Sequence, residues 1–367
     1  MTNPVIGSPF VISEPAFTNA ADNPTVILPN VYPPGVNRPT VVNPPASRNP
    51  NMVNPYSMQY SATIEHQQWN TGFRVSYVGT NTRKGMFGYD INQPPASTQA
   101  YVDKVVRYPF IPGGLTYGTN GAGHQYNALR FQANRTYKSG LTYQFAYTLA
   151  RDIGDLEGGQ SPEDAFNRLR ERAVWTDVAT HQVKSYMVYE LPVGRGRHFA
   201  SGANRLVDAV IGGWNVSSIL FINSGNFLTP QWSGPDPTGT RYTTSRTPPV
   251  VTLRPNYLRN ANLPSDQRSV SRWFDVQAFG APSPGAFGTA PKGAIIGPGN
   301  WILDAGLYKI FRLYERLTFR VEMTGTGVLN HPSWNNPDTT ITNLGSVGVI
   351  TSASGVRSMR FGGRLEW

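Results

Sequence analysis

Five acidic side chains lie close together in the middle of the sequence and form its strongest candidate for a metal site: Asp152, Asp155, Glu157, Glu163 and Asp164. Carboxylate oxygens gathered on one loop can bind Ca²⁺, but this spacing does not match the loop of an EF-hand. Two other interpretations stay open. The carboxylates are solvated on a loop, or they are neutralised by nearby basic residues, namely Arg168, Arg170 and Arg172. The spacing alone does not predict a metal.

No arrangement of side chains predicts catalysis or a cofactor. The five His residues are far apart in the sequence and none has the His-x-x-x-His spacing of a metal site. The sequence has no Cys, which removes disulfides, thiolate metal sites and Cys nucleophiles. It also lacks the Gly-x-Ser-x-Gly and Ser-x-x-Lys motifs of serine enzymes. We predict a protein that is not an enzyme.

Four Trp residues lie in segments that we expect to be loops: Trp175, Trp232, Trp273 and Trp334. Exposed aromatic rings can stack on a sugar or on a large amphipathic ligand, whereas rings packed within a loop only stabilise it. Both interpretations remain open, and we treat these four residues as possible ligand-facing aromatics.

The charge of the chain is basic but dispersed. Lys plus Arg number 32 and Asp plus Glu number 22, which gives a net charge of +10. A nucleic-acid-binding protein usually concentrates such charge on one face, so we predict no nucleic-acid partner. Dispersed basic residues suit strand ends near anionic lipid headgroups. No run of 18 or more apolar residues predicts a transmembrane helix, and no secretion signal is visible.

Apolar and polar residues alternate with a period of two in about nine segments, which is typical of strands with two different faces. Their lengths suit tilted strands that cross a membrane. The predicted strands are 56–68, 73–79, 125–137, 141–150, 182–191, 214–223, 301–311, 317–328 and 357–367. Their connections alternate between short turns, near 70, 139, 202 and 314, and long loops, roughly 80–124, 151–179, 225–299 and about 340. Membrane barrels have short turns at the periplasmic end and long loops outside the cell.

The last predicted strand ends the sequence on an aromatic residue. Phe361, Gly363, Leu365 and Trp367 share one face, and Arg364 lies on the other. A C-terminal strand of this kind resembles the signal that the bacterial barrel-assembly machinery recognises. We therefore predict that Phe361, Gly363, Arg364, Leu365 and Trp367 form this signal.

Two helical segments and an irregular arm complete the prediction. Ser161 as N-cap and Pro162 at the first position favour a short helix over 162–170, and a helical turn is expected over 204–210. Residues 1–55 are rich in Pro and Asn and are predicted to form an extended arm, with 25–28 as its only strand-like part. Residues 56–367 would form the barrel segment.

The sequence from Asn54 to Trp367 resembles the Oar-like TonB-dependent transporters of acidobacterial type. The motifs that carry the resemblance, in order, are Asn54-Pro55-Tyr56, Tyr77-Val78-Gly79-Thr80, Asp90-Ile91-Asn92-Gln93-Pro94-Pro95, Tyr126-Asn127-Ala128-Leu129, Tyr189-Glu190-Leu191-Pro192-Val193-Gly194, Gly212-Gly213-Trp214-Asn215, Trp273-Phe274-Asp275, Ala278-Phe279, Asn330-His331-Pro332 and Phe361 to Trp367. The resemblance implies an outer-membrane barrel of 22 strands that is plugged by an N-terminal domain. It also implies nutrient binding at the outer loops and, where a plug is present, a TonB-type coupling protein as partner.

The predicted fold is therefore all-β, an antiparallel transmembrane β-barrel segment of about nine or ten strands with long extracellular loops. No plug or energy-coupling box is recognisable, so we expect the C-terminal portion of a longer transporter. The first and last predicted strands run in the same direction, and the chain cannot close an antiparallel barrel alone unless 25–32 adds a strand. The alternative function is a surface protein, adhesive or self-assembling, that pairs through open strand edges.

Overall fold

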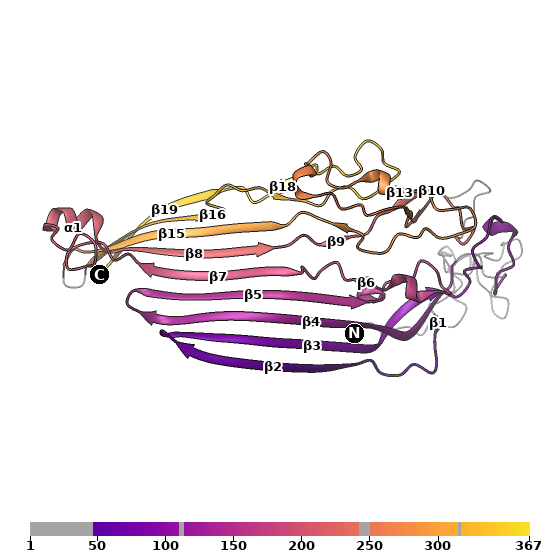
Figure 1. Ribbon diagram of the computed structural model, residues 1–367, viewed down its shortest axis with the longest axis horizontal. Helices are drawn as coiled ribbons and strands as arrows, with labels where there is room; N and C mark the ends of the chain where they lie inside the picture. Colours follow the sequence, from indigo (N-terminus) through magenta and orange to yellow (C-terminus); the bar gives the residue numbers. More distant parts are fainter. Residues whose placement is uncertain (1–46, 110–113, 242–249, 315–316) are drawn as a thin grey trace, which may run out of the picture.

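The main structural unit is one large, open, antiparallel sheet (Figure 1). The computed structural model describes residues 47–109, 114–241, 250–314 and 317–367. The strands follow the order β19-β16-β15-β8-β7-β5-β4-β3-β2, in which almost every strand pairs with its neighbour in sequence. This order confirms the predicted all-β, antiparallel sheet.

The observed strands match most of the predicted ones. They are β2 (Tyr56–Gln68), β3 (Thr71–Asp90), β4 (Thr116–Lys138), β5 (Leu141–Gly154), β7 (His181–Glu190), β8 (Trp214–Asn223), β15 (Asn300–Arg312), β16 (Thr318–Thr326) and β19 (Ser358–Glu366). The shorter connections lie at one end of the sheet and the long ones at the other (Figure 1). We call these the turn end and the loop end.

Two of the hairpin turns have two residues in the left-handed backbone region. Trp69 and Asn70 have φ of 52° and 60°, and Ser139 and Gly140 have φ of 54° and 81°. Two-residue turns of this type follow the natural twist of the two strands that they join. Gly72 lies beyond the first of these turns, already within β3.

Two predictions about the connections differ from the structure and a third is confirmed. The loop expected over 80–124 is shorter, because β3 continues to Asp90 and β4 begins at Thr116. The helix expected over 162–170 does not form, and only a 3-10 turn, Arg168–Glu171, is present. The predicted helical turn is confirmed as α1 (Arg205–Ile211), whose N-cap Asn204 accepts a hydrogen bond from the Val207 amide.

Only the last part of the predicted N-terminal arm falls in the described residues. There β1 (Ser47–Arg48) pairs in parallel with Tyr117 and Gly118 of β4, at the loop end. The strand-like segment 25–28, and the possible extra strand over 25–32, lie outside the described residues.

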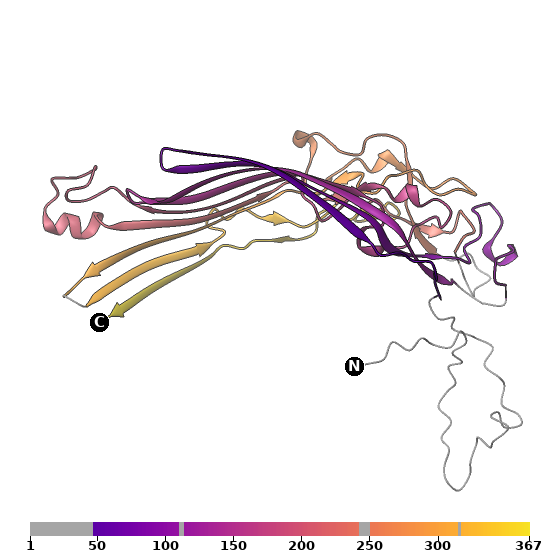
Figure 2. The ribbon, with the colours of Figure 1, turned by 90° about the horizontal axis from the view of Figure 1, so that it is seen from below.

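The long connections carry short strands that pair with one another, except for the first, which pairs with β5 of the main sheet. They are β6 (Ala173–Val174), β9 (Phe227–Leu228), β10 (Trp232–Pro235), β11 (Val250–Leu253), β12 (Asn256–Tyr257), β13 (Phe279–Gly280), β14 (Ile295–Ile296), β17 (Ser333–Trp334) and β18 (Ala353–Ser354). We call the folded connections at the loop end the loop layer (Figure 2).

The hydrophobic clusters of the described residues lie in the loop layer and not beneath the sheet. One is built around Phe274, Ala278 and Ile295, and the other consists of Val251, Leu253 and Phe287. The long sheet has curved, uncovered faces over most of its length (Figure 2). Among the described helices, none combines the length and the apolar character needed to cross a membrane.

The Gly140 turn gives a first test of this fold. A Cβ at residue 140 would lie 3.2 Å from the Cβ and the carbonyl oxygen of Glu190, and φ there is +81°. We expect Gly140→Val to lower the free energy of unfolding by about 1–2 kcal/mol, because a branched residue disfavours the left-handed region. Urea titration of the protein folded into detergent micelles measures this change.

The matched control is Gly202→Ala, at a position where an added Cβ meets nothing within 4 Å. It should leave the unfolding free energy within about 0.5 kcal/mol of the parent. Equal effects of the two substitutions would contradict the assigned turn.

Candidate functional site

One face of the sheet carries an apolar row that runs from strand to strand without a polar interruption. Register pairs place its members side by side: Ile64, Val75, Phe131, Tyr147, Val183, Ile222 and Trp301. A second row nearer the turn end continues it to the last strand: Leu141, Tyr189, Val216, Leu307, Met323 and Phe361. We call these two rows the apolar belt and the face that bears them the outward face.

The apolar belt is exposed. Ile64 is 76% exposed and Phe361 is 78% exposed, and even Phe131, within the sheet, is 36% exposed. Each buried Leu, Ile or Phe side chain typically stabilises a water-soluble protein by about 1.5–3 kcal/mol, so soluble folds do not leave whole rows uncovered. The outward face is therefore suited to contact with hydrocarbon.

The opposite face carries a polar row directly behind the first apolar row. Its members are again register partners: Thr63, Ser76, Arg130, Thr148, Gln182, Asn223 and Asn300. Each one is the sequence neighbour of a belt residue, so the alternation of side chains separates the two kinds of surface. A sheet that is apolar outside and polar inside has the design of a membrane barrel wall.

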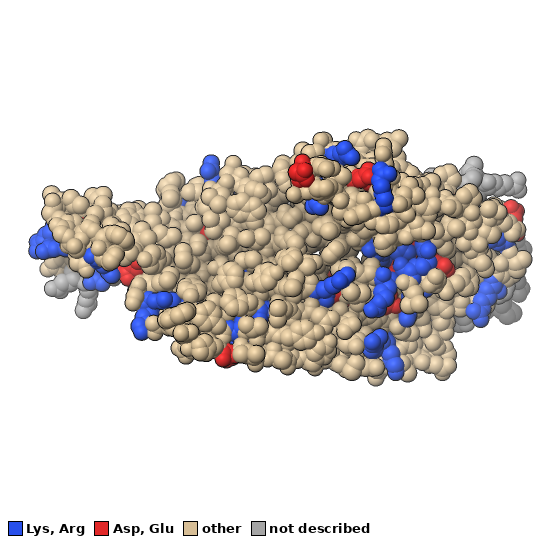
Figure 3. Space-filling model, in the orientation of Figure 1, with Lys and Arg blue, Asp and Glu red and all other residues tan. Residues whose placement is uncertain are grey.

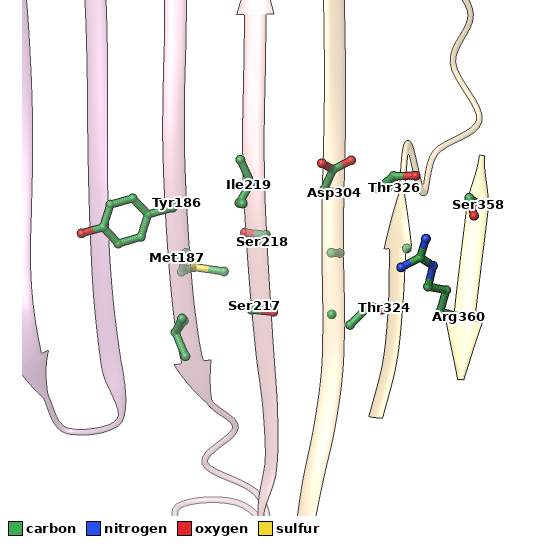
Figure 4. A pocket seen from close by; sticks show the side chains of 14 residues that line it. Tyr186, Met187, Ser217, Ser218, Ile219, Asp304, Thr324, Thr326, Ser358 and Arg360 are labelled. Atoms are coloured by element: carbon green, nitrogen blue, oxygen red, sulfur yellow. The ribbon is translucent and has the colours of Figure 1, made fainter. Parts of the chain in front are cut away.

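A hollow of about 560 Å³ lies against the polar, inward face of β7, β8, β15, β16 and β19 (Figure 4). Its polar lining includes Ser217, Asp304, Thr324 and Arg360. Arg360 extends from β19 across the end of β16, and Tyr186 lies on the far side of the hollow (Figure 4). Tyr186, Val188 and Ile219 add apolar surface to this lining.

The closing strand β19 has the two-faced character that the sequence predicted. Phe361 and Leu365 are exposed on the outward face, and Trp367, just beyond the strand, is 91% exposed. Arg364 lies on the other face, where its Nε is 3.0 Å from a carboxylate oxygen of Glu366. Gly363 faces the ring of Phe319 on β16, which leaves little room for a side chain.

The loop layer is held together by a buried network of ion pairs. Glu171 lies 3.1 Å from the Arg254 guanidinium and 2.7 Å from the Lys292 ammonium, and its side chain is 1% exposed. Glu163 accepts a second ion pair from Arg254 at 3.0 Å and one from Arg170 at 3.3 Å. The network thereby joins the β5–β7 connection to the β8–β15 connection. In Figure 3, basic and acidic side chains gather side by side at the loop end, and the strand region of that view carries few of them.

Burial and charge act in opposite directions on the carboxyl groups of this layer. Burial would raise the pKa of Glu171, but Arg254 and Lys292 overcome that effect, so its pKa lies below the ordinary value of 4.5. Burial and the neighbouring Asp177 carboxyl raise the pKa of Glu157, although the Thr176 amide and hydroxyl donate hydrogen bonds to it. Glu171 therefore stabilises the loop layer as an anion, whereas Glu157 binds a proton at a higher pH than an ordinary Glu side chain.

The acidic residues of the sequence candidate do not converge on one point. Asp152 bonds His124 at 2.9 Å, Asp155 pairs with Arg168 at 2.7 Å, and Glu163 pairs with Arg170. In the described part of the chain, no group of three or more His, Asp or Glu residues could hold a metal ion. Neutralisation by basic residues, one of the two alternatives, accounts for Asp155 and Glu163, which pair with Arg168 and Arg170.

The four candidate aromatics lie apart from one another in the loop layer. Trp175 stacks on His124 with ring centroids 4.2 Å apart and lines a cavity of about 260 Å³ beside Glu171 and Lys292. Trp232 packs against the Val251–Phe287 cluster, and the Trp273 indole donates to the Ile296 carbonyl at 2.8 Å. Trp334, on β17, is 38% exposed. Of the four, Trp175 is the one whose ring borders a cavity next to charged groups.

Sequence reasoning missed one buried charge on the outward face. Lys309 lies between Leu307 and Phe311 on β15, and its ammonium donates to the Ala209 carbonyl of α1 at 2.6 Å. The signal was present in the sequence, because a Lys interrupts an otherwise apolar alternation at that position. The partner Arg254 carried no such signal, since it is distant in sequence from Glu163 and Glu171.

The sequence matches the family model of the outer membrane beta barrel domain over residues 3–360. The chain belongs to this family. The bare apolar belt and the polar inward face are what such a domain requires, and the family places the chain in the outer membrane. The match is to a membrane-barrel family and not to an enzyme family. No curated protein matches the sequence.

Several solved structures are similar to the chain at low sequence identity. The outer membrane transporter YddB from Escherichia coli is 10% identical with a TM-score of 0.41, over 89% of this chain and 35% of that one. The copper transporter OprC is 8% identical with a TM-score of 0.36, over 88% of this chain and 34% of that one. The matched chain of the FpvAI–pyocin S2 complex is 9% identical with a TM-score of 0.37, over 85% of this chain and 26% of that one. The chain thus spans at most about a third of these proteins, and likeness at this level does not define a shared function.

The apolar belt predicts that an introduced charge destabilises the protein much more on the outward face than on the inward face. We expect Phe131→Arg to lower the free energy of unfolding in lipid bilayers by about 2–4 kcal/mol, because it places a charge in hydrocarbon. Refolding into vesicles across a urea series measures the change.

The control Gln144→Arg puts the same charge on the inward face of the neighbouring strand, between Asn134 and Tyr186. It should change the unfolding free energy by less than about 0.5 kcal/mol. A reversed order of the two effects would contradict the assignment of the faces.

The ion-pair network predicts the behaviour of the loop layer. Glu171→Gln leaves Arg254 buried without one of its carboxylates, and we expect a local destabilisation of about 3–5 kcal/mol. Hydrogen exchange at the amides of β11 and β6 should speed up, whereas exchange in β4 and β5 beneath the belt should not change. Glu366→Gln, which removes an exposed pair, should cost less than about 1 kcal/mol.

The same network predicts a pH dependence with a definite sign. Because the folded-state pKa of Glu171 is lowered, its stabilising effect is complete above 4.5 and is lost as the pH falls through the lowered pKa. Protection of the loop layer in the parent should therefore fall on acidification, and Glu171→Gln should flatten that fall. An unchanged acid profile in the variant would contradict the role of this carboxylate.

Proposed function

We propose that the chain forms part of the wall of a TonB-dependent transporter-like barrel that takes up a scarce nutrient bound at its outer loops. One observation carries the proposal: an uninterrupted apolar row faces outward, a polar row lies directly behind it, and neither face of the sheet is covered by a core. The Oar-like subtype belongs to this proposal and rests on the sequence motifs given above.

The topology of the sheet supports a larger barrel. The nine strands of the main path alternate in direction, so the edge strands β2 and β19 run the same way. Closure of an antiparallel barrel therefore needs an odd number of further strands between β19 and β2, from whatever source. Unpaired backbone groups in lipid cost several kcal/mol each, so open edges in a bilayer require such partners. A wall of 22 strands satisfies this parity.

The loop layer supports ligand binding at the outer end. Its own hydrophobic clusters and ion pairs hold the connections in a defined arrangement, which lowers the entropic cost of binding. We propose that Trp175, Trp232, Trp273 and Trp334 contribute aromatic surface there, with Trp175 nearest to a charged cavity. The hollow beside Arg360 on the inward face would then lie on the path towards the periplasm.

The proposed partners follow from the same arrangement. Outer-membrane lipid contacts the belt, and the barrel-assembly machinery recognises the closing strand through Phe361, Gly363, Arg364, Leu365 and Trp367. A TonB-type coupling protein would act only through a plug upstream of the residues that form this wall. Residues 56–367 form the barrel segment in this proposal.

The alternative, a self-assembling surface protein, finds one supporting observation in the free edge of β2, whose residues are exposed along its whole length. Topology limits this alternative. In two copies that cross the membrane in the same orientation, β2 of one and β19 of the other run in the same direction. Antiparallel pairing between copies would therefore require one copy to be inserted upside down. Transport through a longer barrel has no such requirement.

A genetic experiment separates the two functions. Deletion of the whole gene, including its natural upstream coding sequence, should slow growth on one scarce nutrient. Deletion of the gene for the coupling protein should slow growth on the same nutrient. The double deletion should be no worse than either single one, because both act in one transport step. An adhesion or aggregation defect with normal growth under every nutrient limitation would overturn transport and favour assembly.

A further inference from the structure

A short helix at the turn end lies on the outward side of the sheet. Lys309 is an outward residue of β15, and its ammonium donates to the Ala209 carbonyl at 2.6 Å and to the Asp208 carbonyl at 3.4 Å. Trp214, the register partner of Lys309, donates from its indole nitrogen to the Val210 carbonyl at 2.8 Å. Both contacts fix α1 against the outward face, where it extends the turn end (Figure 1).

These contacts bury the Lys309 charge. Lys309 is 4% exposed, and its ammonium lies over the rings of Trp214 and Phe311 at 5.7 and 4.9 Å. A Lys on the outward face would otherwise meet hydrocarbon, which is costly. The carbonyl oxygens of α1 replace water for this ammonium, so the helix belongs to the membrane-facing surface.

The other side of α1 is apolar and uncovered. Leu206 is 82% exposed and Val210 is 68% exposed; with Val207 they share one helical face at spacings of three and four residues. Asp208 points the other way, where it accepts from the Arg195 amide at 2.6 Å. Phe199, in the preceding segment, is also exposed. An apolar helix face that continues an apolar belt needs an apolar partner.

Exposed basic residues lie in the same segment as this helix. They are Arg195, Arg197 and Arg205, of which Arg197 pairs with the Glu190 carboxylate at 2.7 Å. Exposed aromatic residues lie in other turns at the same end, with Trp69 and Tyr314 each 75% exposed. Trp and Tyr collect where a membrane meets water, and basic residues attract anionic headgroups.

We propose that α1 is an interfacial anchor: Leu206, Val207 and Val210 insert between the phospholipids of the leaflet at the turn end, and Arg195 and Arg205 bind their phosphate groups. The occupant is lipid because the helix continues the apolar belt and because the exposed basic residues Arg195 and Arg205, which we call the basic rim, lie in the same segment. The inference rests on the membrane placement of the sheet and is independent of what the barrel transports.

The absence of Cys from the sequence allows a direct test with single labels. The full chain carrying Leu206→Cys is labelled with an environment-sensitive fluorophore and inserted into vesicles of phosphatidylethanolamine and phosphatidylglycerol. Leu258→Cys, an exposed position in the loop layer, is the aqueous control, and Phe131→Cys is the control for the belt. The comparison uses preparations in which the belt control is shielded from aqueous iodide.

We expect iodide to quench the probe at 206 about threefold or more weakly than the probe at 258, as for a helix face buried some ångströms into the interface. Lipids brominated near the headgroup should quench it more strongly than lipids brominated at the chain end. Equal iodide quenching at 206 and 258 would overturn the proposal and would assign the apolar face to a protein partner instead.

The basic rim has its own test. In vesicles of phosphatidylcholine alone, the shielding of the probe at 206 should decrease, and the variant Arg195→Gln/Arg205→Gln should remove the difference between the two lipid compositions. The probe at Phe131→Cys should not respond to either change. Shielding that is unaffected by both lipid charge and the double substitution would overturn the assignment of Arg195 and Arg205 as phosphate-binding residues.

Discussion

The structure depends on one constraint: a peptide group in hydrocarbon has no water to bond, so each strand must find its partners in the neighbouring strands. The nine-strand sheet meets this constraint everywhere except at its two edges. Because the strands are then fixed side by side, their side chains can only alternate between the two faces. The row from Ile64 to Trp301 and the row from Thr63 to Asn300 are the direct result of that alternation.

The chain packs its side chains differently where it faces lipid and where it faces water. Within the sheet, apolar side chains point outward and no core forms, since lipid takes the place of a core. Beyond the loop end the connections behave like a small water-soluble protein, with Phe274 and Ile295 buried and charged groups paired around Glu171. The turn end is a third environment, where the carbonyl oxygens of α1 accept hydrogen bonds from the buried Lys309 ammonium.

The loop layer also shows why local helix signals failed. Ser161 and Pro162 favour a helix, but the amides that a helix would use bond elsewhere: the Ala165 amide donates to the Gln93 side chain, and Glu163 is held by Arg254. A buried ion pair that costs several kcal/mol to break outweighs helix preferences of a few tenths of a kcal/mol per residue. The helix signal around Asn204 met no such competitor, and α1 formed.

The sequence by itself determined the strands and their faces, because the period of two records which side chains meet lipid. It located β7 and β8 almost to the residue, and it failed for the outer parts of β3 and β4, which lie beyond the belt and keep no alternation. Only the tertiary structure decided the register that aligns the belt, the pairing of Glu171 with Arg254 and Lys292, and the position of α1 over Lys309. Those contacts join residues far apart in sequence, and no local pattern records a partner that chain folding alone brings near.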